Sequence, residues 1–245
     1  MVVKIKNIDI NYTQYGSGKR NIVLLHGWGQ NIEMMNPIGT KLEKDATITV
    51  IDLPGHGKSE EPKEAITIYD YCDVVKELLD KLKIKKPILI GHSFGGRISI
   101  IYASLYDTEK LILLGAPCIR KNTKVSLKVK MLKTLKKVPG LNKMEGFAKK
   151  HIGSRDYKNA SETMRKILVN TVNEDLTECA KKIKCPTLLI WGTNDQAVPY
   201  SDGQELEKLI KDCGLVTYEN CTHYAYLERL GQTVNVLNSF IGDDK

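Results

Sequence analysis

Short apolar segments recur along the chain and are separated by longer segments in which apolar residues follow a helical period. The apolar segments lie at 21–25, 47–51, 87–90, 110–117, 186–192 and 215–218. The segments with helical spacing lie at 32–42, 69–82, 98–105, 201–211 and 226–241. Buried strands that alternate with helices over short connections are typical of a mostly parallel, doubly wound α/β sheet. Sheets of this kind bind ligands at the carboxyl ends of their strands.

The beginning of the chain has a different pattern. Apolar and polar residues alternate from Val2 to Tyr15, and Gly16-Ser17-Gly18 follows. Alternation with a period of two is typical of a strand that is buried on one face only. The sequence therefore predicts an antiparallel hairpin that opens the sheet.

One segment interrupts the alternation of strands and helices. Residues 118–183 contain no strand-like run, and a helical apolar face is formed there by Val125, Val129, Leu132, Leu135 and Val138. We predict a small helical cap, or lid, at 118–183, inserted into a core of residues 1–117 and 184–245. This segment has 17 basic and six acidic residues and a net charge of +11, whereas the rest of the chain has −3. A solvated basic face is the plainest interpretation, and attraction of anionic substrates or of an anionic membrane surface is the alternative.

The composition excludes several classes of protein. With 42% hydrophobic and 27% charged residues, the 245-residue chain is typical of a globular protein in water. No apolar run approaches the roughly 18 residues that cross a bilayer, and the first residues lack the apolar core of a signal peptide. The six cysteines form no Cys-x-x-Cys pair and no cluster with histidine. We therefore expect reduced thiols, a cytoplasmic protein without an integral membrane segment, and no metal site. The basic excess lies in one segment, so it does not indicate nucleic acid binding.

The segment Gly91-His92-Ser93-Phe94-Gly95 joins an apolar strand to a helical segment and has the Gly-x-Ser-x-Gly pattern of a nucleophile elbow. A sharp turn from strand to helix strains Ser93 and exposes its hydroxyl at the carboxyl end of the sheet. A side chain two residues before or after the serine would crowd that turn, and Gly91 and Gly95 have none. The pattern therefore predicts that Ser93 is a nucleophile.

Four other motifs follow predicted strands in the same manner. In chain order, the five are His26-Gly27-Trp28-Gly29, Asp52-Leu53-Pro54-Gly55-His56-Gly57-Lys58-Ser59, Gly91-His92-Ser93-Phe94-Gly95-Gly96, Trp191-Gly192-Thr193-Asn194-Asp195 and Thr222-His223. With these motifs the chain resembles the α/β-hydrolase fold superfamily nearly from end to end, and the cap is the least matched part. The resemblance implies the fold and a Ser-His-Asp triad, and it leaves the substrate open.

A serine hydroxyl becomes a strong nucleophile when a histidine accepts its proton and an acid orients that histidine. The resemblance implies the order serine, acid, histidine, which makes His223, after the last strand, the expected base. Asp195 is the expected acid, because it follows a buried strand and lies between Ser93 and His223. Asp52 also ends a strand, but the Pro-Gly-His-Gly run after it indicates a structural turn. The less well placed carboxylates are Asp202 and Glu219.

The family pattern also implies an oxyanion hole made of two backbone N–H groups, those of Trp28 and Phe94. The Trp28 ring has two interpretations, a wall of the acyl pocket or a core side chain. His26 is expected to be a structural hydrogen-bonding residue. Arg97 is expected at the surface or at the sheet edge. The Gly-Gly-Arg run also resembles the carboxylate-binding arginine of a menaquinone-pathway lyase, from which this chain differs in having His92, and not tyrosine, before the serine.

These residues predict a serine hydrolase that cleaves small to medium carboxylic esters, or thioesters, through an acyl-enzyme on Ser93. Serine at the elbow weighs against haloalkane dehalogenases and epoxide hydrolases, which have aspartate there. Three alternatives stay open: a C–C bond hydrolase or lyase with the same triad, a ligand receptor that retains the triad, and a membrane-associated lipase. We expect no cofactor, because Gly27-x-Gly29 lacks the rest of a dinucleotide fingerprint. The oligomeric state is left open.

Overall fold

The computed structural model describes residues 1–120 and 160–242, so the predicted helix around Val129 lies outside the described residues. The strands are β1 (Val2–Ile5), β2 (Ile8–Tyr15), β3 (Arg20–Leu25), β4 (Ala46–Ile51), β5 (Ile88–His92), β6 (Lys110–Leu114), β7 (Thr187–Gly192) and β8 (Cys213–Tyr218). The helices are α1 (Ile32–Leu42), α2 (Ile68–Lys81), α3 (Phe94–Leu105), α7 (Glu162–Asn173), α8 (Thr177–Lys181), α9 (Tyr200–Leu209), α10 (Ala225–Glu228) and α11 (Leu230–Gly242).

The eight strands form one sheet in the order β1-β2-β4-β3-β5-β6-β7-β8. β1 pairs with β2 and β2 with β4 in antiparallel fashion, and every pair from β4 to β8 is parallel. The predicted opening hairpin is confirmed. It turns at Lys6 and Asn7, whose φ angles of 46° and 63° are those of a two-residue hairpin turn. The predicted fold class, a mostly parallel, doubly wound α/β sheet, is also confirmed.

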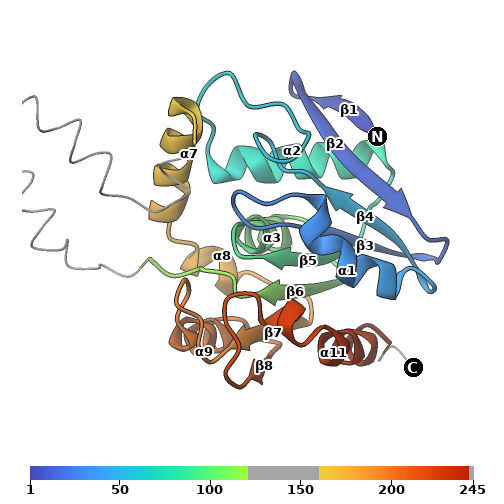
Figure 1. Cartoon of the computed structure of the whole chain (residues 1–245), viewed down its shortest axis with the longest axis vertical. Helices are drawn as coiled ribbons and strands as arrows, with labels where there is room; N and C mark the ends of the chain where they lie inside the picture. Colours follow the sequence, from blue (N-terminus) through green and yellow to red (C-terminus); the bar gives the residue numbers. More distant parts are fainter. Residues whose placement is uncertain (121–159, 243–245) are drawn as a thin grey trace, which may run out of the picture.

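Helices cover both faces of this sheet (Figure 1). Ile22 and Leu24 of β3 face a core that α1 and α11 complete, whereas Val23 and Leu25 face a second core under α2, α3, α8 and α9. Successive residues of the central strands are therefore buried on opposite sides, and this is why those strands are apolar without alternation.

Short polar side chains determine where several helices begin. Asn31 accepts a hydrogen bond from the Glu33 N–H at the start of α1. Thr67 and Asp70 form a capping box at the start of α2. Such caps satisfy backbone N–H groups that have no partner in the first helical turn. The predicted single helix at 226–241 is wrong in one respect, because the chain leaves helical geometry at Arg229, between α10 and α11.

α7 lies at the side of the molecule toward which the β6 arrow points (Figure 1). Its buried residues are Met164, Ile167 and Thr171. Met164 packs on the loop after β4, where a Cβ atom added to Gly55 would lie 2.5 Å from the Met164 sulfur. α7 therefore borders the carboxyl edge of the parallel strands.

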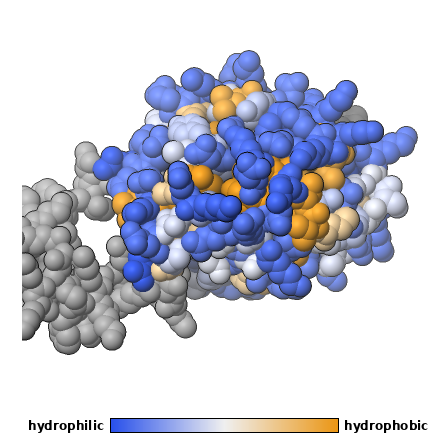
Figure 2. Space-filling model, turned by 90° about the horizontal axis from the view of Figure 1, so that it is seen from above, coloured by the Kyte–Doolittle hydropathy of each residue, from blue (hydrophilic) through white to orange (hydrophobic). Residues whose placement is uncertain are grey.

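Seen from above, the surface is mostly hydrophilic and carries a streak of apolar atoms (Figure 2). The large apolar side chains most exposed in the described ranges are Met1, Val2, Tyr69, Leu105, Val169, Val172 and Tyr224. Within residues 1–120 and 160–242, no helix has the length and apolar character that crossing a membrane requires.

Candidate active site

Ser93 lies between β5 and α3 with a φ of 50° and a ψ of −109°, a backbone conformation that residues other than glycine rarely adopt. Close packing explains both flanking glycines. A Cβ atom on Gly91 would lie 2.5 Å from Ser99 Oγ, and one on Gly95 would lie 2.4 Å from the Leu25 carbonyl oxygen. Holding a residue in such a conformation costs on the order of 1–3 kcal/mol, which the surrounding packing must offset. The turn is therefore strained in the way the sequence predicts.

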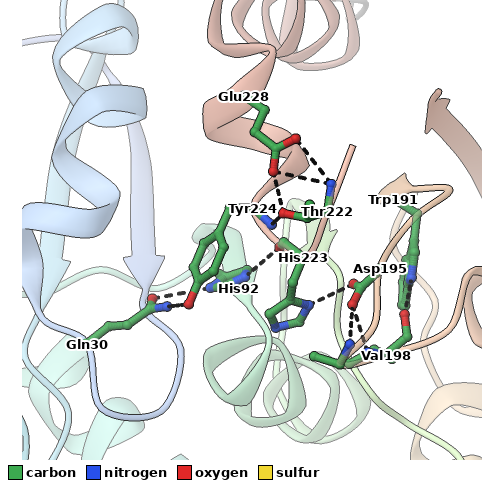
Figure 3. Close-up of polar contacts among 10 residues, drawn as sticks. Gln30, His92, Trp191, Asp195, Val198, Thr222, His223, Tyr224 and Glu228 are labelled. Carbon is green, nitrogen blue, oxygen red and sulfur yellow. Dashed lines mark hydrogen bonds and ion pairs between the residues drawn. The ribbon is translucent and has the colours of Figure 1, made fainter. Parts of the chain in front are cut away.

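Asp195 and His223 come together from the ends of two neighbouring strands, β7 and β8 (Figure 3). His223 Nδ1 lies 2.7 Å from Asp195 Oδ2, and the side chains are 14% and 1% exposed. The other carboxylate oxygen accepts the N–H groups of Ala197 and Val198, both at 2.8 Å. This carboxylate is therefore fixed on both sides, and the imidazole donates its Nδ1 proton to it and keeps Nε2 free to accept another.

Gly115 connects this pair to the serine. The Ser93 N–H donates to the carbonyl of Leu114 at 3.0 Å. The next residue, Gly115, has a φ of +54°, and a Cβ atom there would lie 3.1 Å from His223 Nδ1. Ser93 and the His223–Asp195 pair thus lie on either side of one short turn. In the described part of the chain no hydrogen bond joins the Ser93 and His223 side chains, which is common where a substrate has yet to bind.

The backbone N–H groups of Trp28 and Phe94 have no protein acceptor in the described ranges. Phe94 is the first residue of α3, so its N–H belongs to the positive end of the helix dipole. The rings of Trp28 and Phe94 pack edge to face, 5.1 Å apart between centroids, and His56 lies against Trp28 at 4.8 Å. The Trp28 ring is therefore packed in an aromatic cluster beside the elbow.

The competing carboxylates have other partners. Asp52 is buried and accepts hydrogen bonds from Asn11 Nδ2 and from the N–H groups of Ile32 and Lys58, all within 2.8 Å. It organises the turn after β4, as the sequence predicts. Glu219 accepts a hydrogen bond from Thr193 at 3.4 Å. His223 makes no hydrogen bond to Asp52 or Glu219 in the described ranges.

Two further histidines are buried beside the site. His26 Nε2 accepts the Leu53 N–H at 3.0 Å, so its Nδ1 donates to the Gly27 carbonyl. This agrees with the predicted structural role. Burial lowers the pKa of His26 to about 4 and the pKa of His92 to about 3. Both side chains are therefore neutral near pH 7.

Sequence reasoning missed the polar groups that support the His223 loop (Figure 3). His92 Nε2 donates to the His223 carbonyl at 3.1 Å, and Gln30 donates to the Tyr224 hydroxyl at 3.2 Å. Glu228 of α10 accepts from the Thr222 N–H at 3.2 Å and also from the Thr222 hydroxyl. The contacts of His92 and Gln30 join residues far apart in the chain, and no short motif encodes them.

The expectation that Arg97 lies at the surface or at the sheet edge is wrong. Arg97 is 5% exposed, and its guanidinium donates to the carbonyl groups of Pro117, Thr171 and Glu174. Its side of α3 is covered by the chain segments to which these carbonyls belong. Within the described residues, no group of three or more His, Cys, Asp or Glu side chains is arranged to hold a metal ion.

The architecture and the elbow define a hydrolase-type α/β fold, and a comparison with known families agrees. The chain belongs to the α/β hydrolase fold family, whose profile matches residues 20–151. A second profile, described as TAP-like protein, matches residues 159–241.

Individual relatives are distant but cover nearly the whole chain. Monoacylglycerol lipase ABHD6 of Mus musculus is 26% identical over an alignment of 260 positions that covers 91% of this chain and 76% of that protein. The AB hydrolase superfamily protein YisY of Bacillus subtilis (strain 168) is 28% identical over an alignment of 249 positions that covers 90% of this chain and 91% of that protein. Among solved structures, MGS-M2, an α/β hydrolase enzyme from a Medee basin deep-sea metagenome library, superposes with a TM-score of 0.81 at 18% identity and covers 100% of this chain and 98% of that one. This structural likeness supports the fold.

Proposed function

We propose that the protein is a serine hydrolase of carboxylic esters that acts through an acyl-enzyme on Ser93. The observation that carries the proposal is the 2.7 Å hydrogen bond between His223 and the buried Asp195, on the far side of Gly115 from the strained serine. In the proposed triad, Ser93 is the nucleophile, His223 the base and Asp195 the acid. The N–H groups of Trp28 and Phe94 are the proposed oxyanion donors.

The reaction follows from these roles. The Ser93 hydroxyl attacks the acyl carbon and passes its proton to His223 Nε2. Negative charge develops on the former carbonyl oxygen, and the two N–H groups stabilise it. His223 then gives the proton to the departing alcohol, which leaves the acyl group on Ser93. A water molecule attacks the acyl-enzyme with His223 again as base, and the carboxylic acid is released.

For the substrate, we propose small to medium carboxylic esters, with thioesters as the related alternative. The similarity to a protein named monoacylglycerol lipase supports including a monoacylglycerol among the esters tested. The aromatic side chains of Trp28 and Phe94 beside the elbow suit an apolar acyl group.

We also propose that residues 118–183 form a cap on a core of residues 1–117 and 184–245. The helical character of α7 and α8 supports this division. All six cysteines are free, which supports a reducing compartment, and we propose the cytoplasm.

The test combines covalent labelling with a substrate series. A fluorophosphonate should label the wild-type protein and not Ser93→Ala, and turnover of 4-nitrophenyl esters should fall on the order of 10⁶-fold in that variant. Ser104→Ala is the matched control, because Ser104 lies on α3, the helix that follows Ser93, and its hydroxyl donates to the Ile101 carbonyl. Wild-type activity toward a vinylogous diketone and none toward esters would favour C–C bond cleavage. If Ser93→Ala kept most of its esterase activity, the assignment of the nucleophile would be wrong.

A further inference from the structure

The segment that follows β6 lies beside the segment that joins α7 to α8. We name residues 117–120 and 171–176 the stem. The Leu176 N–H donates to the Cys118 carbonyl at 3.0 Å, and both residues are buried. The stem is therefore a packed connection, and α7 ends within it.

Arg97 of α3 binds both segments of the stem. Its Nη1 donates to the Pro117 carbonyl at 3.0 Å, and its Nη2 donates to the carbonyls of Thr171 at 2.8 Å and Glu174 at 2.6 Å. The Thr171 carbonyl belongs to the last turn of α7 and also accepts the Glu174 N–H at 3.3 Å. At this end of a helix the dipole favours a cation. One guanidinium thus joins the outgoing segment of the stem to the end of α7.

The burial of the Arg97 guanidinium makes its hydrogen bonds depend on the position of the stem. Within the described ranges no carboxylate lies within 4.0 Å of the Arg97 guanidinium, although it is almost completely buried. A buried cation is costly unless its donors are satisfied. The three carbonyls bind the two Nη groups, whereas the buried Nε has no partner in the described ranges, so they offset only part of that cost. They do so only while the stem stays in place, so the position of α7 is energetically coupled to Arg97.

Arg97 is also close to the proposed nucleophile. The backbone N–H of Arg97 donates to the Ser93 carbonyl at 3.1 Å, so the two residues are one helical turn apart at the start of α3. At the other end of α7, Met164 packs on Gly55, next to His56, which contacts the Trp28 ring. α7 therefore spans from the stem to the aromatic side of the site.

We propose that Arg97 is a positioning residue that holds α7 at the carboxyl edge of the sheet and thereby sets how well the site binds the acyl part of its substrate. The role in substrate binding rests on the proposed ester hydrolysis. The hold on α7 does not, and it can be measured separately.

The kinetic test uses Arg97→Met, Arg97→Lys and a matched control, Arg20→Met. Arg20 also donates to a backbone carbonyl, that of Ile241. It begins β3, so it lies at the amino ends of the parallel strands, away from the candidate site. In Arg97→Met, the KM of a medium-chain 4-nitrophenyl ester should rise about tenfold, the equivalent of one charge-assisted hydrogen bond. The kcat for the acetate ester should change less than about twofold, because the triad is untouched. Arg97→Lys should fall between Arg97→Met and wild type, and Arg20→Met should leave both constants unchanged.

Hydrogen exchange tests the hold on α7 without catalysis. Amides of residues 162–173 should exchange faster in Arg97→Met than in wild type or Arg20→Met, while those of β5 and β6 keep their protection. If Arg97→Met does not fold, Arg97→Lys is measured in its place with the same expectation in smaller degree. Unchanged exchange in α7, or a fall in kcat of equal size for every ester, would overturn the proposal. Faster exchange in a protein that hydrolyses no ester would retain the hold on α7 and reject the proposed function.

Discussion

At the scale of single residues, two buried aspartates at strand ends have different partners. Asp52 accepts hydrogen bonds from three donors that belong to the strand β2, the start of α1 and its own turn. Asp195 accepts two N–H groups with one oxygen and presents the other to His223. Burial alone does not identify a catalytic acid, and the distinguishing feature is which partner the second oxygen has.

This difference predicts opposite outcomes for the same substitution. Asp195→Asn should lower kcat about 10⁴-fold, because the amide no longer fixes the histidine tautomer that accepts the serine proton. Asp52→Asn should lower the free energy of unfolding by about 1–3 kcal/mol, because a buried N–H is left without its acceptor, and should leave kcat within about threefold. Steady-state kinetics and urea unfolding of both variants measure this. A larger loss of kcat in Asp52→Asn would make Asp52 the better candidate for the acid.

Residues differed in how far the sequence could predict them. Ser93, Gly91 and Gly95 belong to one five-residue motif, and the turn that strains the serine is local. Gly115 was not predicted. Its φ is positive, and the groups that leave little room for a Cβ atom there are Asp195 and His223, which follow much later in the chain. Arg97 was misplaced for a related reason, since its partners are backbone carbonyls that leave no trace in the sequence.

At the scale of elements, the loop from β8 to α10 is the part of the site held by the most varied contacts. Asp195 holds the His223 ring, His92 holds the His223 carbonyl, and Glu228 holds Thr222. The sequence predicted β8 and the position of the histidine after it. It did not predict that α10 ends at Glu228, because the break at Arg229 interrupts an apolar period that continues into α11.

The contact from α10 gives a prediction for this loop. Hydrogen bonds from Thr222 lower the pKa of the Glu228 carboxyl, so the charged form is the one that holds the loop. Glu228→Gln should lower kcat about fivefold with little change in KM, since one charge-assisted contact near the surface is lost. Glu219→Gln is the matched control, because Glu219 lies on the same loop and its contact with Thr193 is longer, at 3.4 Å. Equal effects of the two substitutions would mean that α10 does not position the base.

At the scale of the whole molecule, three histidines besides the proposed base are buried in the described part of the chain. His26 follows β3, His92 ends β5 and His56 lies in the turn after β4, so all three lie at the edge that carries the candidate site. The doubly wound fold explains this placement, because parallel strands bring their carboxyl ends to one edge. Buried imidazoles are tolerated there as neutral groups whose ring nitrogens accept hydrogen bonds from the loops or donate hydrogen bonds to them.

These histidines predict how stability depends on pH. Burial lowers the pKa of each, to about 4 for His26 and about 3 for His92, whereas the unfolded chain has histidines near 6.5. Between these values the unfolded state binds more protons, so the stabilisation is complete above about pH 6.5 and is lost as the pH falls toward the folded-state values. Each histidine contributes a slope of up to about 1.4 kcal/mol per pH unit. Carboxyls with lowered pKa values, such as Asp70 and Glu228, add to this loss only in the more acidic part of the range.

Urea unfolding at pH 7, 6 and 5 measures this slope. The wild-type free energy of unfolding should fall steeply between pH 6 and 5, and His92→Asn, which keeps a donor for the His223 carbonyl, should lose about a third of that slope. His26→Asn should remove a similar share of the slope, because His26 is buried to the same extent as His92. A free energy of unfolding that stays level from pH 7 to 5 would mean that the three imidazoles gain protons in the folded protein as readily as in the unfolded chain, and that the carboxyl edge of the sheet admits water.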